Sequence, residues 1–560
     1  MTTGRDSPRQ RGKTFAVVLR QVSLPDGESE KNLVARAARS LGCGEEDILA
    51  CRPLRRSLDA RKRNKRPLWI YHLRVELPSV LRKKLRSAPP AGIEFEKRTP
   101  ALFQSSPDPA RPAGRPRPLV VGAGPAGLFA ALRLARAGWN PILVERGDAV
   151  AERQAAVAGF WRTGRLDPES NPLFGEGGAG LFSDGKLNTR HKDREGIRIV
   201  LEALVGAGAP EDILLEAEPH VGSDLLGEIV ARLAGEIRGR GGEVRHRCRL
   251  DRLDADGGVL RGAELSPREG GEAIEIADCV LATGHSARDV YTMLERGGTA
   301  LAAKPFAIGL RAEMPQAAID ASQRAPGKGK PAASFRLTRP PEGGLAACYT
   351  FCMCPGGLVI ACASEPGFLA VNGMSSRARA GDWGNAAFLS PVAAEDFAFA
   401  RAGVVADSTP LSGIAFQRHW EEKAYLAGLP AGKYAVPACG LEAFVRGEAG
   451  KLPAERGVVR AAAANLRELL PPRIADTLAA AIPAMLMRMR KVDPATVVLY
   501  GVETRTSGPV RILRTGGGAS VSLAGLYPAG EGAGYAGGIV TSALDGWRAA
   551  GRLMLAAAAT

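Results

Sequence analysis

The sequence predicts an α/β protein of several domains, and three observations carry that prediction. The chain has 560 residues, which at roughly 100–200 residues per domain is enough for about three domains. Its composition, 45% hydrophobic and 24% charged, is that of an ordinary globular protein that can bury a large core. From Leu119 onward a short apolar strand, a glycine-rich turn, a helix and a second strand follow one another. That order is typical of a βαβ unit.

The first hundred residues predict a small α+β module of the ferredoxin-like type. Residues 14–22 and 68–77 alternate in part between apolar and polar side chains, as strands do. Residues 29–42 between them predict a helix, with Ser29 as its N-cap and Gly42 as its end.

Positive charge gathers in this region. Residues 1–118 hold 26 Lys and Arg against 12 Asp and Glu, which leaves 49 and 47 for the rest of the chain. The net charge of +16 therefore belongs mostly to the module, residues 1–100, and to the proline-rich linker that follows it, residues 101–117. Such a surplus is compatible with an anionic partner such as nucleic acid; the ordinary alternative is an arginine-rich solvated surface.

Residues 118–147 contain a complete dinucleotide-binding fingerprint, from strand through turn and helix to a second strand that ends at Glu145. Gly122 makes the tight turn, Gly124 lets a pyrophosphate approach the backbone, and Gly127 lets the helix pack close to the strand. Glu145 can accept hydrogen bonds from ribose hydroxyls, and its carboxylate would repel the 2′-phosphate of NADP. The helix N-terminus offers free N–H groups to phosphates. We assign to this nucleotide site Gly122, Gly124, Pro125, Ala126, Gly127, Glu145 and Arg146.

Two later segments resemble the second and third signatures of flavoproteins. The first is the apolar strand that ends at Thr283-Gly284, and the other is residues 525–538, in which Glu531 stands where many relatives have Asp. The resemblance implies FAD rather than NAD as the bound cofactor, with Glu531 reaching a ribitol hydroxyl. It adds to the cofactor site Thr283, Gly284, Gly530, Glu531, Gly538 and Ile539.

Longer strings narrow the resemblance. They are residues 55–62, 171–189, 351–357, 501–512 and 527–538. With them the chain resembles the largely uncharacterised bacterial FAD-dependent dehydrogenases of the glutathione-reductase-like superfamily, which carry a distinctive C-terminal FAD-associated region. The resemblance covers nearly the whole chain and implies oxidoreductase activity without naming a substrate. It implies a discontinuous Rossmann-like FAD-binding domain, residues 118–300 and 496–560, with a mixed α/β cap domain inserted at 301–495.

By the same resemblance, residues 174–189 line the isoalloxazine side of the flavin. The contacts expected from this glycine-rich segment are Gly177, Gly178, Ser183, Asp184 and Gly185. Lys186 would place a positive charge near the flavin ring, and His285, next to Gly284, could act as an acid or base. A surface lysine and a structural histidine are the ordinary alternatives, and His220 is a further candidate.

Cys348, Cys352 and Cys354 would share one face of a strand. Their spacing is neither that of a zinc site nor that of a flavin disulfide reductase, so we expect buried cysteines and no metal. Arg505 could contact an anionic substrate or the flavin, or form an ion pair with Glu503.

The sequence thus predicts an FAD-dependent oxidoreductase that passes hydride or electrons between FAD and a small-molecule substrate, with NADH or NADPH as a candidate transient donor. One alternative is a flavin-binding protein without turnover. Another is an RNA-directed flavoprotein whose module grips phosphates through Arg55, Arg56, Arg61, Lys62, Arg63, Lys65, Arg66 and Trp69. No stretch reaches the ~18 apolar residues of a membrane helix, no signal peptide is recognisable, and cysteines are sparse. We therefore expect a cytoplasmic protein with no membrane span.

Overall fold

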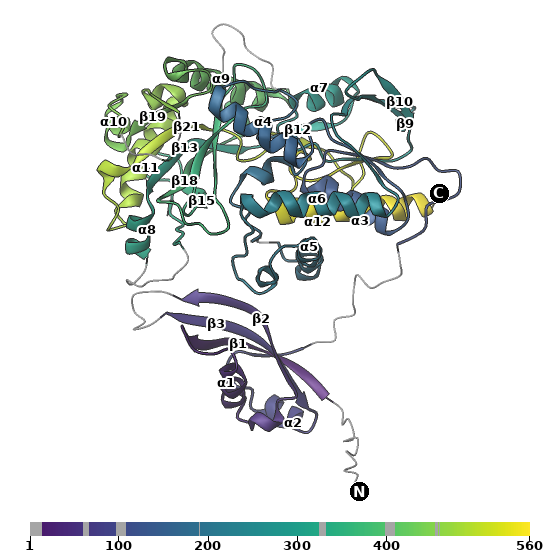
Figure 1. Cartoon of the computed structure of the whole chain (residues 1–560), viewed down its shortest axis with the longest axis vertical. Coiled ribbons are helices and arrows are strands. Elements are labelled where there is room, and N and C mark those ends of the chain that lie inside the picture. The colour runs from purple at the N-terminus through teal and green to yellow at the C-terminus, as the bar shows by residue number, and fades with distance from the viewer. Residues whose placement is uncertain are drawn as a thin grey trace. The chain divides into compact units, whose positions relative to one another are not determined.

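The computed structural model describes residues 14–59, 67–96, 108–189, 191–323, 332–397, 409–453, 457 and 460–559. The chain divides into two compact units (Figure 1). The first comprises Met1–Ser106 and Glu211–Pro219, and the second comprises Pro107–Pro210 and His220–Thr560.

The first unit is an antiparallel sheet with strand order β2-β3-β1-β4, and Figure 1 shows its two helices on one side of the sheet. Its elements are β1 (Thr14–Pro25), α1 (Asn32–Leu41), β2 (Ala50–Asp59), β3 (Leu68–Pro78), α2 (Leu81–Ser87) and β4 (Ile93–Phe95). Alternate residues of β1 and β3, such as Leu19 and Leu73, pack with Leu33 and Leu41 of α1 into one apolar core.

Two details of this unit differ from the sequence expectation. Helix α1 begins at Asn32, three residues later than Ser29, and its N-cap is Lys31 without a side-chain cap hydrogen bond. The Ser29 hydroxyl instead accepts a 3.3 Å hydrogen bond from the Lys31 backbone N–H in the turn before the helix. Strand β2 was not anticipated, because its arginine-rich sequence lacks an apolar stripe and β2 lies at the sheet edge.

A parallel sheet with strand order β23-β11-β5-β6-β7 lies at the centre of one half of the second unit. Its strands are β5 (Leu119–Val121), β6 (Ile142–Val144), β7 (Glu243–Arg245), β11 (Cys279–Leu281) and β23 (Leu526–Pro528). The last residues of β5, β11 and β23 pair directly: Val121 with Leu281, and Leu281 with Pro528. Three segments from distant parts of the chain therefore leave the sheet at the same edge.

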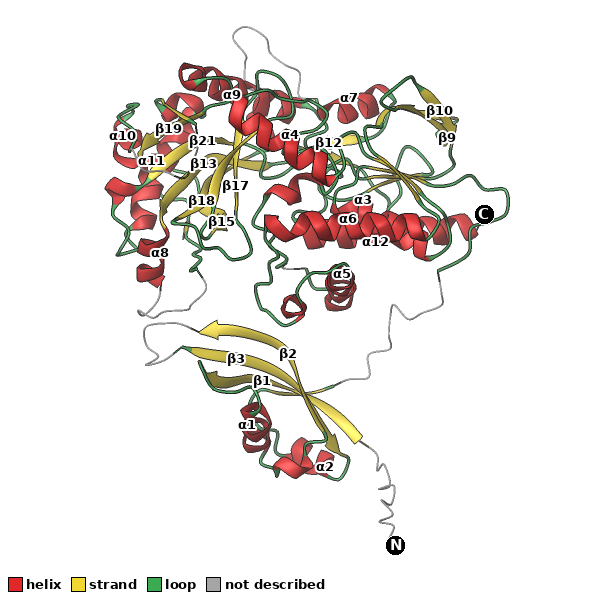
Figure 2. Ribbon diagram, viewed as in Figure 1, coloured by secondary structure: helices red, strands yellow, loops and turns green. Residues whose placement is uncertain are grey.

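Helices α3 (Pro125–Arg136), α6 (Ser223–Gly239) and α12 (Ile539–Ala558) run along this sheet, and Figure 2 shows them close together. Helix α12 packs tightly on α3, since a Cβ at Gly546 would lie 1.8 Å from the Ala126 carbonyl oxygen. Further elements of this half are α4 (Val150–Thr163), α5 (Arg194–Gly206), α7 (Arg288–Arg296) and the antiparallel strands β8 (Arg249–Asp256), β9 (Val259–Ser266) and β10 (Glu272–Glu275).

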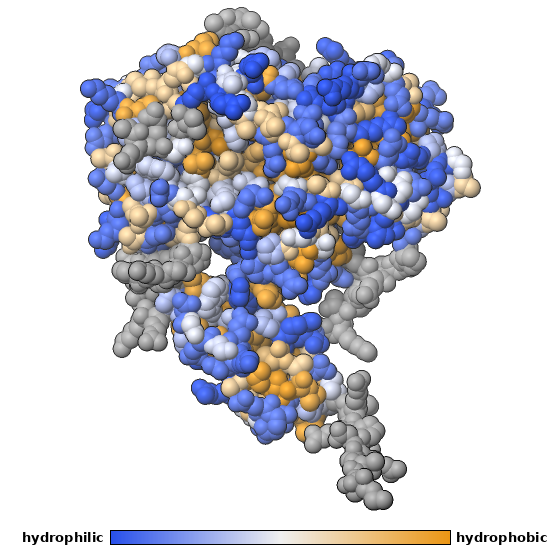
Figure 3. All heavy atoms as spheres, in the orientation of Figure 1, coloured by the Kyte–Doolittle hydropathy of each residue, from blue (hydrophilic) through white to orange (hydrophobic). Residues whose placement is uncertain are grey.

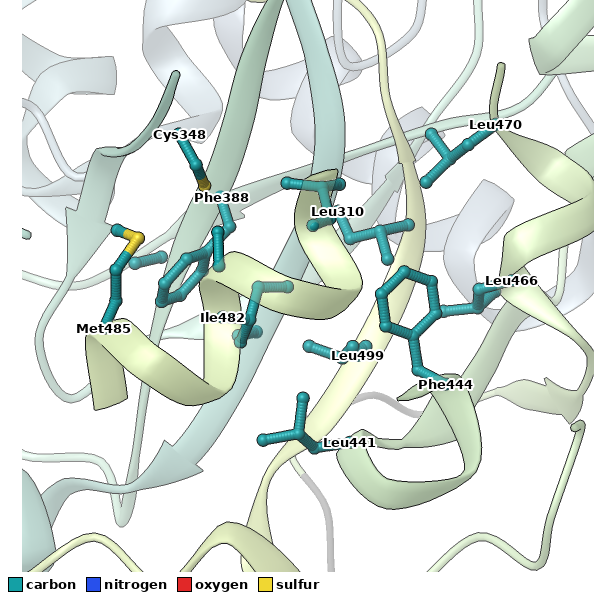
Figure 4. Packing of buried hydrophobic residues seen from close by; sticks show 14 of the residues in the cluster. Leu310, Cys348, Phe388, Leu441, Phe444, Leu466, Leu470, Ile482, Met485 and Leu499 are labelled. Atoms are coloured by element: carbon teal, nitrogen blue, oxygen red, sulfur yellow. The ribbon is translucent and has the colours of Figure 1, made fainter. Parts of the chain in front are cut away.

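The other half is built on a seven-stranded sheet with strand order β14-β15-β18-β13-β21-β19-β20. Its strands are β13 (Phe306–Pro315), β14 (Thr338–Arg339), β15 (Cys348–Cys354), β18 (Trp383–Val392), β19 (Val436–Gly440), β20 (Ala461–Ala463) and β21 (Val498–Glu503). The helices of this half are α8 (Gln316–Gln323), α9 (Ser412–Gly428), α10 (Leu441–Arg446) and α11 (Pro472–Leu486). Figure 4 shows side chains of α11, such as Ile482 and Met485, packed with Phe388 and Cys348 of the sheet.

Two short antiparallel pairs complete the second unit. They are β12 (Leu301–Ala303) with β22 (Val510–Ile512), and β16 (Leu358–Cys362) with β17 (Ala370–Met374). Among the described residues, no helix combines the length and apolar character that crossing a bilayer requires. Figure 3 shows hydrophilic residues over much of the visible face.

Candidate functional site

A pocket lies in the second unit where β5, β11 and β23 end. Of the twenty residues assigned from the sequence to cofactor binding or catalysis, seventeen line it. They are Gly122, Gly124, Pro125, Ala126, Glu145, Arg146, Gly178, Ser183, Asp184, Lys186, Thr283, Gly284, His285, Gly530, Glu531, Gly538 and Ile539. Gly127, Gly177 and Gly185 do not line it. A Cβ at Gly127 would lie 1.7 Å from the Gly122 carbonyl oxygen, so that glycine permits close packing of helix on strand.

The glycine-rich turn after β5 and the glycine-rich segment at 175–180 touch each other. A Cβ at Gly178 would lie 3.0 Å from Cα of Gly124, and the N–H of Gly177 donates to the Ala123 carbonyl at 2.8 Å. Helix α3 starts immediately after Gly124, with Pro125 in its first turn. The pocket wall at this point is therefore bare backbone beside a helix N-terminus.

Glu145 is buried, and both of its carboxylate oxygens accept hydrogen bonds from the backbone. Its oxygens accept from the N–H groups of Ala123 at 2.8 Å, Gly147 at 3.0 Å and Gly175 at 2.9 Å. A carboxylate has about four acceptor positions, so Glu145 retains capacity for a hydroxyl in the pocket. Its neighbour Arg146 also lines the pocket, and its guanidinium is paired with Glu169 and Asp289.

Arg153 of α4 organises the 171–178 loop and was not anticipated from the sequence. Its guanidinium is fully buried and donates to the backbone carbonyls of Asn171, Gly175, Glu176 and Gly178 at 2.8–3.2 Å. Burial lowers its pKa to about 10. No local spacing marks this residue, because its partners are the carbonyls of a loop about 20 residues later in the chain.

Lys186 stands on the pocket wall as a fixed positive charge. Its ammonium group donates to the Met353 carbonyl and lies 3.5 Å from Asp184. Asp184 is fully buried, pairs with Arg379 and accepts from the hydroxyl of Ser375. These contacts hold the segment before Lys186 against the second half of the unit.

His285 and Glu531 both line the pocket, and Nδ1 of His285 lies 3.8 Å from Oε2 of Glu531. Burial, together with the positive charges of Arg505, Arg288 and Lys304, lowers the pKa of His285 to about 3. Burial raises the pKa of Glu531 to about 7. His285 is therefore neutral at pH 7, and Glu531 is the group of this pair that exchanges a proton near neutrality.

His220 does not line this pocket, although its backbone pairs with that of Lys186, which does. Its Nε2 is 3.1 Å from the carbonyl oxygen of Arg377, and burial lowers its pKa.

Arg505 lines the pocket. The ion pair with Glu503 that the sequence suggested for it does not form. Its guanidinium binds Glu421, with Nη2 2.8 Å from the carboxylate, while Glu503 binds Arg311. Arg288 binds the same buried carboxylate at 2.9 Å. One buried glutamate thus anchors two arginines beside the pocket.

The three cysteines do not share one face, because β15 is irregular. Its pairing with β18 shifts register between Phe351 and Cys354, and Cys352 has a φ of 45°. Cys348 and Cys354 are buried, whereas Cys352 lines the pocket. Among the described residues, no group of His, Cys, Asp or Glu side chains could hold a metal ion.

Three family models match the chain. Residues 118–217 match the model of the FAD-dependent oxidoreductases, and residues 305–506 match that of the C-terminal domain of FAD-dependent proteins. Residues 19–76 match a domain of unknown function. A protein from Clostridium beijerinckii, described as uncharacterized, is 38% identical over 544 residues, which cover 96% of this chain and 98% of the relative.

The chain belongs to the FAD-dependent oxidoreductases. Its likeness to solved structures is remote. The flavin-dependent brominase Bmp2 is 12% identical with a TM-score of 0.36, over 79% of this chain and 81% of the brominase. The anhydrotetracycline hydroxylase OxyS from Streptomyces rimosus is 17% identical with a TM-score of 0.26, over 50% and 47% of the two chains.

The pocket of this FAD-dependent oxidoreductase fits the cofactor in two respects. Gly284 and Gly538 have φ values of 73° and 87°, and a Cβ at either would meet nothing within 4 Å, so both leave open space. Nε2 of His285 and the hydroxyl of Ser286 are buried and have no hydrogen-bond partner among the described residues. A bound cofactor would satisfy such atoms.

The sequence did not point to several other lining residues. They are Cys248, Arg249, Leu250, Phe351, Asn372 and Thr506. They belong to strands and turns without a recognisable motif, and only the tertiary fold brings them to the pocket.

Proposed function

We propose that FAD binds in this pocket and exchanges an electron pair there with a small-molecule substrate. The turn Gly122–Gly127 and Glu145 would hold the ADP part, and the segment from Gly178 to Lys186 would face the flavin ring. The observation that carries this proposal is the common edge at which β5, β11 and β23 end, because it gathers all three glycine-containing turns around one pocket.

FAD, when bound, supplies a ring system that accepts or gives up two electrons. The chain supplies fixed charge and a proton. The ammonium group of Lys186, held by the Met353 carbonyl and Asp184, favours negative charge near it. The Glu531 carboxyl, with a pKa raised to about 7 by burial, can hold or release a proton at the pocket floor.

His285 has a different role from the one expected of an acid–base group. Since its pKa is lowered to about 3, it stays neutral and offers a hydrogen bond rather than a charge. Its unpaired Nε2 is available to a bound ring or substrate.

The RNA-directed alternative rested on the basic residues of the module. Residues 60–66, which hold Arg61, Lys62, Arg63, Lys65 and Arg66, lie outside the described residues. Arg56 is paired with Glu216 and Glu30, and the indole N–H of Trp69 donates to Asp26 at 3.1 Å. These partners leave Arg56 and Trp69 with fewer groups that could bind RNA phosphates or bases. The other alternative was a flavin-binding protein without turnover, and membership in an oxidoreductase family favours an enzyme over it.

The first test is the absorbance spectrum of the purified protein, followed by anaerobic titration with NADH and NADPH. A flavin band that one nucleotide bleaches supports a nicotinamide-driven reductase; a flavin band that neither bleaches directs the search to another donor. A protein without a flavin band, even after reconstitution with FAD, contradicts the proposal.

A glycine variant tests the position of the cofactor. A Cβ at Gly124 would be in ordinary contact with Gly178, 3.7 Å away, so the fold should accept Gly124→Ala. We expect FAD binding to weaken tenfold or more, about 1.4 kcal/mol, because the methyl group occupies the path of the pyrophosphate. Gly235→Ala is the matched control, since a Cβ there meets nothing within 4 Å on an exposed face of α6. Equal FAD affinity in both variants would place the cofactor elsewhere.

A further inference from the structure

Two cysteines meet at the irregular end of β15. In a regular strand the side chains of residues two apart lie roughly 6.6 Å from each other. Here the register shift and the left-handed conformation of Cys352 replace that geometry, and the thiol of Cys354 lies 3.3 Å from the Cys352 carbonyl oxygen. Neither sulfur is in a disulfide.

Positive charge surrounds this pair. Arg311 donates to the Cys352 carbonyl at 3.1 Å, and its Nη1 is 4.0 Å from the Cys354 sulfur. Lys186 lies on the pocket side, where it donates to the carbonyl of the intervening residue, Met353. Two carboxyl groups oppose them: Glu503, which is ion-paired with Arg311, and Glu531, whose pKa is raised in part by Cys352.

These surroundings shift the pKa values of the two thiols in opposite directions. Interaction with the Cys354 side chain, together with the positive charges of Lys186 and Arg311, lowers the pKa of Cys352 to about 6 against the effects of burial and Glu503. The same interaction, together with burial, raises the pKa of Cys354. A thiolate that faces a pocket, next to a protonated thiol behind it, is the arrangement of an attacking and a resolving cysteine.

We propose that Cys352 and Cys354 form a redox-active dithiol that exchanges an electron pair with the flavin in this pocket. In one direction the Cys352 thiolate and the Cys354 thiol form the S–S bond, and the oxidised flavin takes up the two electrons and the one proton that Cys354 loses. In the other direction the reduced flavin gives two electrons and one proton to the disulfide, the S–S bond breaks, Cys352 leaves as the thiolate and Cys354 is protonated. No further oxidant or reductant is needed. The inference rests on the proposed binding of FAD in this pocket.

Cys348, on the same strand, does not share these features. Figure 4 shows it beside Phe388 in the core of the sheet, and burial raises its pKa to about 12. It is therefore the matched control for the two proposed redox cysteines.

The test is an anaerobic dithionite titration of the full-length protein loaded with FAD and oxidised with diamide. We expect the protein to take up four electrons per flavin, two for the flavin and two for the disulfide. Cys352→Ser and Cys354→Ser should each take up two, and Cys348→Ser should take up four. A flavin-loaded wild-type protein that takes up only two electrons overturns the dithiol and leaves the proposed FAD site intact.

A second measurement needs no variant. The diamide-treated protein is alkylated with iodoacetamide, digested without reductant and analysed by mass spectrometry. We expect the peptide that holds Cys352 and Cys354 to carry an internal disulfide and no alkyl group, and two alkylated cysteines in it would refute the proposal. Absence of any flavin band after reconstitution would refute the proposed function and, with it, the electron exchange.

Discussion

Replacing Glu421 by Gln should destabilise the second unit strongly. Glu421 is fully buried, and its two oxygens accept five hydrogen bonds. Oε1 accepts from Arg288 at 2.9 Å, Arg505 at 3.0 Å and the Thr504 hydroxyl at 2.7 Å. Oε2 accepts from Arg288 at 3.0 Å and Arg505 at 2.8 Å. In Glu421→Gln, the amide oxygen can take the place of Oε1. The amide NH₂ group then takes the place of Oε2, where it faces the N–H donors of Arg288 and Arg505 and cannot accept from them.

The expected loss follows from those contacts. A hydrogen bond to a charged group contributes about 1.5–3 kcal/mol, and removing one partner of a buried ion pair costs about 3–5 kcal/mol. Glu421→Gln removes two such bonds and leaves two buried arginines with one fewer negative charge. We therefore expect the free energy of unfolding to fall by about 3–5 kcal/mol.

Urea-induced unfolding at neutral pH measures this loss, provided that the slope against urea concentration is unchanged. Glu442→Gln is the control, because Glu442 is 68% exposed and 3.7 Å from Arg446, and such surface pairs contribute at most about 1 kcal/mol. A loss below about 1 kcal/mol for Glu421→Gln would refute the reasoning.

The pH dependence gives an independent check on the same carboxylate. Burial raises the pKa of Glu421, but Arg288 and Arg505 outweigh it and hold that pKa well below its usual range. A group with a lowered folded-state pKa stabilises above its unfolded-state pKa, and this stabilisation is lost as pH falls. The difference between wild type and Glu421→Gln should therefore be full at neutral pH and shrink in acid.

Three further predictions concern the pocket. Because burial raises the pKa of Glu531 to about 7 from 4.5, this group stabilises the apoprotein fully below pH 4.5 and no longer above 7, and Glu531→Gln should flatten thermal stability across that window. Lys186→Met should raise the pKa of Cys352 above its value of about 6, so the pH at which iodoacetamide alkylation reaches half its maximal rate should rise; an unchanged profile would remove Lys186 as the cause. Arg153→Met should lower the free energy of unfolding, measured with urea, by about 3 kcal/mol or more. It should also weaken FAD binding, measured by flavin fluorescence; wild-type values for both quantities would show that the 171–178 loop does not need Arg153 to keep its conformation.

The sequence could assign the first glycine-rich turn and Glu145 to one pocket because the determinants of this segment are local. The glycines after β5 and the acid after β6 fall within about 30 residues, and each has a geometric reason that a sequence displays. Strands β5 and β11 were recognisable for the same reason, since each is an uninterrupted apolar run that ends in a turn, whereas the segment of β23 was identified by its resemblance to a flavoprotein signature.

The residues that the sequence missed depend on distant partners. Arg153 is recognisable only when the loop whose carbonyls it binds is in place. Cys352 lines the pocket because the pairing of β15 with β18 shifts register next to it. The sequence of β15 alone does not reveal this shift. Glu421 lies far in the sequence from both Arg288 and Arg505. The sequence could therefore suggest only a near neighbour, Glu503, as the partner of Arg505.

The pairing of strand β11 in the parallel sheet has a consequence for how the protein folds. Strand β11 is paired on one side with β5 and on the other with β23, and both partners lie far from it in the sequence. Contacts between such distant segments form late, because the intervening chain must first be closed into a loop. Until β23 has paired, one side of β11 has no partner strand, and the turn after β23 that carries Gly530 and Glu531 is missing from the pocket. The pocket wall is therefore complete only after this late pairing, and every earlier stage of folding depends on the protein's own packing.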